Sequence, residues 1–278
     1  MQGHYESPLV PTQPRMTPGP SAAPAVRVLD SVRFVFDDRD WKTNCLIGVV
    51  FLFIPIVGPI ALAGWLCEIH QRLVRGHPQP VPKLDFSDLG HFLGRGVAPF
   101  LVQLVLTVPI WMLMVGGYFV AAFGSLALIA GTGEPLLGLV VVLLVVACVG
   151  VLALLLGVVM NAAFTRAELT ESFGGALSLG PLLQYTRTTW LQFLIKNILF
   201  GFVSMGIMIV GMALFCVGIY PAAIVLQIAA MHLRWQIYRY HVDHGGEPIA
   251  VKEPQALPSE AARPHYGYGP PAGTGGHF

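Results

Sequence analysis

Two histidines are the strongest candidates for metal-binding side chains in this sequence. His70 and His232 each carry an imidazole that could bind zinc, if the chain brought both to a carboxylate such as Glu68 or Asp243. The more common role of a histidine at the polar end of an apolar segment is to face lipid headgroups. We therefore expect no metal site and no cofactor.

The sequence lacks the short motifs that mark many catalytic sites. A Walker loop, a GxSxG elbow, an HExxH pair and a dinucleotide-binding fingerprint are all missing. The cysteines lie in apolar stretches without a CxxC pair, at Cys45, Cys67, Cys148 and Cys216. We expect them to pack as small apolar side chains rather than bind a metal. These observations predict that the protein is not an enzyme.

Three amides within apolar segments could contact a substrate. Gln103, Asn161 and Gln227 offer donors and acceptors, although amides in such segments commonly hydrogen-bond a neighbouring helix. Glu134 lies in a Gly-x-Gly-Glu-Pro turn, where a solvated carboxylate is the ordinary interpretation. A polar substrate path therefore stays open as an alternative to interhelical packing.

These side chains lie in or beside long apolar segments that contain almost no charged residues. Apolar segments at 44–67, 97–164 and 197–231 hold 127 residues and a single charged one, Glu134. A helix in a soluble protein keeps one wet, charged edge, so 68 consecutive residues of this kind indicate an integral membrane protein. This excludes a soluble enzyme and a secreted disulfide scaffold. A net charge of +1 also gives no reason to expect nucleic acid as a partner.

We predict an all-α, polytopic membrane helix bundle. A turn at 131–135 divides the central apolar segment into two full spans, near 100–130 and 136–164. The segments 44–67 and 197–231 flank these spans as Pro-interrupted hairpins or spans.

The interruptions contain Pro55, Pro59 and Pro221. Proline removes a backbone donor, and non-helical backbone at membrane depth must be covered by protein or line a cavity. We therefore expect the turns at 55–59 and 218–221 to be buried inside the bundle.

The remaining segments flank or connect the membrane domain, which we place at 27–244. Residues 1–26 and 245–278 are rich in Pro, Gly and small residues, as is typical of disordered tails. The connectors 85–96 and 165–179 space their apolar residues as a helix does, which predicts short helices lying in the membrane interface.

The distribution of basic residues favours one topology. If both interrupted segments turn back, all 16 Lys and Arg fall on one side, and the turn at 131–135 stands alone on the other. If each segment crosses once, the basic residues divide almost evenly between the two sides. Because basic residues collect on the cytoplasmic side, we prefer the first arrangement. It describes a multi-pass protein of the cell membrane with both termini cytoplasmic.

The two interrupted segments share a Pro-x10-His-x-Arg pattern. Pro59 precedes His70, and Pro221 precedes His232, by eleven residues, or about three helical turns. One interpretation is a duplicated half with interrupted helices that meet at a central site, as in many transporters. The other is that helices leaving a membrane commonly begin near proline and end in polar residues.

Small residues also form a stripe at a spacing of four, at Gly117, Ala121 and Ser125. Such a stripe lets another helix approach closely. Packing within the same chain is the ordinary interpretation, and a homo-oligomer or membrane-protein interface is the alternative.

Several short sequence patterns occur together in this chain. They are Trp41-x6-Gly48, the Ile-Pro-Ile-Val-Gly-Pro run at 54–59, the Arg-Leu-Val-Arg-Gly run at 72–76, Asp-Phe-x-Asp at 85–88, Phe173-x3-Leu177 and Gly218-x2-Pro221. With these patterns the chain resembles, over 30–241, the uncharacterised prokaryotic family catalogued as domain of unknown function 4013. The resemblance implies a polytopic membrane protein of bacteria or archaea, and it supplies no activity and no functional residue.

Three classes of function remain. A non-catalytic scaffold or accessory subunit is favoured, because the apolar segments carry almost no ionisable residue. A small-solute transporter or channel would need a polar cavity lined by the three amides and the interrupted turns. A membrane-interface enzyme would need the histidines to converge with Asp243. In each case the lipid bilayer is the expected partner.

Overall fold

The computed structural model describes residues 25–214 and 217–261, and this part of the chain contains helices and no strands. The helices are α1 (Val28–Asp37), α2 (Trp41–Leu52), α3 (Val57–Val74), the short 3-10 helix η1 (Phe86–Asp88), α4 (Leu89–Thr132), α5 (Pro135–Thr170), α6 (Phe173–Leu177), α7 (Leu179–Ala213), α8 (Ile219–Asp243) and α9 (Pro258–Ala261). The predicted all-α class is confirmed.

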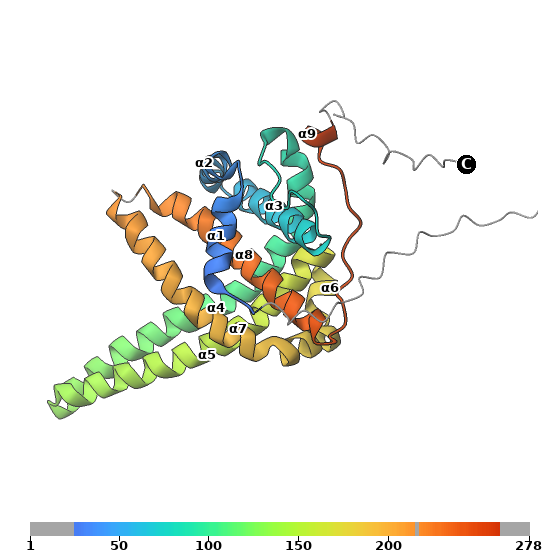
Figure 1. Cartoon of the computed structure of the whole chain (residues 1–278). Coiled ribbons are helices and arrows are strands. Elements are labelled where there is room, and N and C mark those ends of the chain that lie inside the picture. The colour runs from blue at the N-terminus through green and yellow to red at the C-terminus, as the bar shows by residue number, and fades with distance from the viewer. Residues whose placement is uncertain (1–24, 215–216, 262–278) are drawn as a thin grey trace, which may run out of the picture.

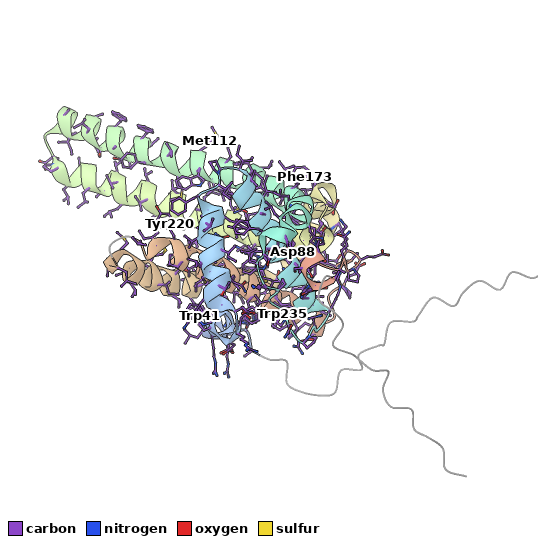
Figure 2. The ribbon with its side chains drawn as sticks, turned by 90° about the horizontal axis from the view of Figure 1, so that it is seen from above. Trp41, Asp88, Met112, Phe173, Tyr220 and Trp235 are labelled. Carbon is purple, nitrogen blue, oxygen red and sulfur yellow. The ribbon has the colours of Figure 1, made fainter. Side chains whose placement is uncertain are left out.

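Three segments among the described residues are long and apolar enough to cross a membrane, by length and composition: Phe86–Thr132, Pro135–Thr170 and Leu179–Ala213. Their most apolar stretches are almost bare of protein, with 11%, 0% and 6% of residues buried. In Figure 1, α4 and α5 run side by side and project far from the other helices. Figure 2 shows Met112 on this projecting part of α4, where its side chain is 70% exposed. Apolar surface of this extent needs lipid around it, so the chain is a membrane protein.

The turn between α4 and α5 lies at the predicted place. Thr132 is the last residue of α4, Gly133 adopts φ +72°, and Pro135 opens α5. A left-handed residue after a helix is most easily a glycine, and proline fits the first turn of the next helix. Both helices extend beyond the predicted spans 100–130 and 136–164.

The two predicted connector helices differ from expectation. Residues 89–96 are the first turns of α4 itself, which continues without a break through Gly96, where it packs against α3. In the second connector, α5 continues to Thr170, and Glu171 ends it in a left-handed conformation with φ +48°. Only the short helix α6 remains of that expected interfacial helix.

The helical head consists of α1, α2, α3 and α8 with the adjoining parts of α4, α5 and α7 (Figure 1). Buried apolar side chains from these helices form its core. Helices α3 and α4 cross backbone to backbone at Gly64 and Gly96. A Cβ on Gly96 would lie 1.8 Å from the carbonyl oxygen of Ile60, and one on Gly64 would lie 1.9 Å from that of Phe92. Only glycine at both positions permits this crossing.

The turn between α2 and α3 occupies residues 53–56. Pro55 is exposed there, as is Ile56, which has φ +65° and an exposed fraction of 69%. We expected this turn to be covered by the bundle, but within this chain it is open. Pro59 lies in the first turn of α3, and Pro221 in the first turn of α8, where a missing N–H is tolerated.

The C-terminal segment, residues 245–261, lies along the helical head (Figure 1). The backbone N–H of Lys252 donates to the carbonyl of Leu169, at 3.0 Å, and the side chain of Leu257 is fully buried. The sequence predicted a disordered tail from residue 245. Two apolar anchors, Ile249 and Leu257, hold this part of it against the helices. Residues 1–24 and 262–278 of the predicted tails lie outside the described residues.

The small-residue stripe on α4 faces α5 of the same chain. A Cβ on Gly117 would lie 2.6 Å from a methyl group of Val149, and Ala121 is buried. A Cβ on Gly138 would lie 3.3 Å from the carbonyl oxygen of Ser125. The stripe therefore packs against α5 within this chain, and its use as an interface between chains stays a prediction.

Candidate functional site

A buried ionic cluster lies where the polar ends of α3, α4, α5 and α8 meet. Helix α3 contributes Glu68 and Arg72, which pair at i,i+4 with 2.5 Å between Arg72 Nε and Glu68 Oε1. Both side chains are almost fully buried. The same helix also supplies His70 and Gln71, so four of the five residues at 68–72 are polar.

Arg95 of α4 connects the carboxylates of this ionic cluster. Its side chain is 3% exposed and pairs with Glu68 and with Glu171, whose Oε1 lies 2.5 Å from Nη2. Arg95 Nη2 also donates to Gln71 Oε1 at 2.6 Å. One guanidinium thus neutralises two carboxylates and ties α4 to α3 and to the end of α5.

Glu168 of α5 forms the second centre of the ionic cluster. His70 Nδ1 lies 2.7 Å from Glu168 Oε2, and the guanidinium of Arg234 from α8 pairs with the same carboxylate. On the far side of the imidazole, His70 Nε2 is buried without a hydrogen-bond partner among the residues the structure describes.

The C-terminal segment completes the ionic cluster. Glu260 accepts two hydrogen bonds from Arg72, at 3.0 and 2.8 Å, and Lys252 Nζ lies 2.9 Å from Glu171 Oε2. Arg75 donates to the carbonyl oxygen of Lys252. The pairing therefore extends from four helices to the segment that follows α8.

The electrostatics favour ionised, mutually paired groups. Burial raises the pKa of the Glu171 carboxyl, but hydrogen bonds from Arg95 and Lys252 outweigh this effect and hold the pKa below its ordinary value. A carboxylate held ionised by two cations is a poor proton donor or nucleophile at neutral pH. The arrangement is suited to fixing helices in place.

A cleft of about 530 Å³ opens beside the ionic cluster, between α3, α4, α5 and α8. Its polar lining is formed by Gln103, Gln227, Glu168 and Arg234. Its apolar lining comes from Leu52, Pro59, Leu62, Ala63, Leu66, Pro99, Phe100, Phe164, Leu226 and Ala230. We call this the amide cleft.

The structure brings some of the predicted site residues together and separates others. Gln103, Gln227 and Pro59 line the amide cleft, and His70 reaches its edge through Glu168. Asn161 lines a different groove, of about 480 Å³, and its amide donates to the carbonyl of Gly157 on its own helix.

His232 and Asp243 have other partners. His232 stacks on Phe34, with 4.2 Å between ring centroids, and its Nδ1 lies 3.3 Å from Ser31 Oγ. Asp243 pairs with Arg239 on its own helix. Within residues 25–214 and 217–261, no group of three His, Cys, Asp or Glu side chains is placed to hold a metal ion.

Sequence reasoning missed most of the ionic cluster. The residues it overlooked are Arg72, Arg95, Glu168, Glu171 and Arg234, together with the contribution of Glu260. We counted the basic ones as charges flanking the membrane. The available signal was that opposite charges stand at the polar end of every apolar segment, which favours pairing once these ends meet.

The fold and site define an all-α integral membrane protein whose helical head is built around paired buried charges. Residues 47–216 match the family described as "Protein of unknown function (DUF4013)", and the chain belongs to this family. No curated protein and no solved structure matches the chain.

Proposed function

We propose that this protein is a non-catalytic membrane protein that acts as a scaffold or accessory subunit. The observation that supports this proposal is the pairing within the ionic cluster. Arg95 neutralises Glu68 and Glu171, and Arg234 neutralises Glu168, so the buried charges serve one another. Such pairs specify how helices meet and leave no activated nucleophile or base.

The topology we propose places the helical head and both termini at the cytoplasmic side. The α4–α5 hairpin then crosses the membrane and exposes its turn, at Gly133 and Glu134, on the other side. The concentration of buried charge at one end of the molecule supports this arrangement, because a paired ionic cluster belongs outside the hydrocarbon.

A scaffold requires a partner, and co-purification tests for one. The protein would be extracted from its native membrane in a mild detergent, affinity-purified and weighed by native mass spectrometry. We expect a stoichiometric complex with a second copy or with another membrane protein. A monomer that carries no protein in fixed ratio would contradict the scaffold role.

A small-solute transporter is a second candidate, favoured by the amide cleft. Gln103 and Gln227 line that cleft, as the transporter hypothesis requires, whereas Asn161 lies in another groove. In proteoliposomes, a cysteine replacing Gln103 or Gln227 would be probed with an impermeant thiol reagent from each side. Access from both sides would support transport, and access from one side alone would oppose it.

A further inference from the structure

The amide cleft combines an apolar wall with a polar end. The wall contains Phe100 and Phe164, which belong to two of the membrane-crossing segments. The polar end holds Glu168, whose side chain is 8% exposed, paired with Arg234, whose side chain is 11% exposed. Gln103 is exposed and marks the open side of the cleft. A molecule entering there would come from lipid.

The chemistry of the polar end selects an uncharged headgroup. Arg234 and Glu168 neutralise each other, so a charged ligand would find an opposing charge beside each attractive one. The amides of Gln103 and Gln227 each provide both donors and acceptors, and neither side chain has a hydrogen-bond partner among the described residues. A hydroxyl group, which donates and accepts at once, is complementary to this set.

We propose that the amide cleft binds a neutral lipid with a free hydroxyl group in its headgroup, of the diacylglycerol class. This hydroxyl donates to one of the amides of Gln103 and Gln227 and accepts from the other, beside the Glu168–Arg234 pair. The acyl chain lies along Leu62, Phe100 and the neighbouring apolar wall. A volume of about 530 Å³ suits a headgroup and the first part of a chain.

The test uses a photoreactive diacylglycerol in phosphatidylcholine nanodiscs that hold the full chain. We expect cross-links to peptides of α3 and α4 that line the amide cleft, located by mass spectrometry. Gln103→Leu and Gln227→Leu should each lower this labelling about 3- to 10-fold, because each removes a hydrogen-bond partner of the headgroup. Ala63→Phe, which fills the cleft without touching its polar end, should abolish the labelling.

Asn161→Leu is the matched control, since this amide lies in the other groove and already bonds to its own helix. It should leave labelling unchanged, and thermal unfolding would confirm that all variants fold. Three further probes test which part of the lipid is recognised. An acyl methyl ester lacks the hydroxyl, phosphatidylglycerol carries a charge, and glycerol, added as a competitor, lacks the acyl chains. Equal labelling by the ester or by phosphatidylglycerol, displacement by glycerol, or unchanged labelling of the glutamine variants would each overturn the proposal.

Discussion

Arg95 shows how one buried residue determines whether the ionic cluster is stabilising. Its side chain is 3% exposed and lies between Glu68 and Glu171. Without Arg95, two nearby carboxylates would share a site with little water. The free-energy cost of this arrangement is larger than the net stabilisation that either ion pair provides. The contribution of Arg95 is therefore best measured by its removal.

Arg95→Met should destabilise the protein by about 3–5 kcal/mol, because two buried carboxylates lose their common cation. The measurement is thermal or denaturant unfolding in detergent micelles. Arg239→Met is the control. Arg239 pairs with Asp243 across 3.9 Å at the surface, with side-chain exposures of 54% and 34%, so its loss should change stability by less than about 1 kcal/mol. Equal effects of the two variants would show that the ionic cluster is not a structural centre.

A second prediction for a single residue concerns His232 and the pH dependence of the protein's stability. Burial, reinforced by the nearby His70, lowers the pKa of His232 to about 4. The folded state therefore holds this imidazole neutral, whereas the unfolded chain binds a proton below about pH 6.5. The stability it contributes is present above pH 6.5 and is lost as the pH falls towards 4.

His232→Phe keeps the stacking on Phe34 and removes the titrating group. The difference in unfolding free energy between pH 7 and pH 4.5 should shrink by about 2 kcal/mol relative to the wild type. Unfolding temperatures in a non-ionic detergent, measured across this range, check the prediction. His77→Phe, at an exposed histidine, should behave as the wild type does. A His232→Phe protein that is as acid-sensitive as the wild type would contradict the proposed cause.

At the scale of elements, the crossing of α3 and α4 depends on backbone contact. A Cβ on Gly96 would lie 1.8 Å from the carbonyl oxygen of Ile60, so Gly96→Ala should separate the helices and destabilise the protein by about 1–3 kcal/mol or more. Gly94→Ala, on the same helix, meets nothing within 4 Å and should be neutral or slightly stabilising. Unfolding temperatures of the two variants measure the difference. Equal unfolding temperatures of the two variants would contradict the backbone contact between α3 and α4 at Gly96.

The C-terminal segment supports the helical head from outside. A chain ending at residue 246 loses the buried Leu257 and the pair between Glu260 and Arg72, so it should be less stable by at least about 2 kcal/mol. A chain ending at residue 261 keeps these contacts and should match the full chain. Unfolding temperature and limited proteolysis of the two truncations provide the test. Equal stability of the two truncated chains would mean that residues 247–261 do not stabilise the helical head.

The sequence predicted elements well where one local signal dominates. The segment 97–164 carries one charge, and the glycines and proline of its turn end one helix and begin the next. The ionic cluster could not be predicted in this way. Glu68 meets Arg95 because α3 and α4 cross at glycines, and that crossing has no periodic signature. Residues 245–261 have the composition of a tail, yet Ile249 and Leu257 are buried against the helices, and Lys252 and Glu260 pair with the ionic cluster.

At the scale of the whole molecule, the long helices are longer than the membrane is thick. Helix α5 has 36 residues and spans about 54 Å, against a hydrocarbon core of about 30 Å. In the topology that we propose, roughly 20 residues of α5 lie in lipid, and the end that carries Arg166 and Glu168 extends into the helical head. The long helices would then serve both as membrane anchors and as part of the helical head.

This geometry, together with the one-sided distribution of Lys and Arg, predicts the outcome of thiol labelling on intact cells. Single cysteines would be placed at Thr132, His77 and Gly174 in a cysteine-free background, all at exposed positions. Thr132→Cys lies at the far end of the α4–α5 hairpin and should react with a membrane-impermeant reagent. His77→Cys and Gly174→Cys lie beside the ionic cluster and should react only after permeabilisation. Labelling of His77→Cys on intact cells would instead require α2 and α3 to cross the membrane once together and would reject the one-sided topology.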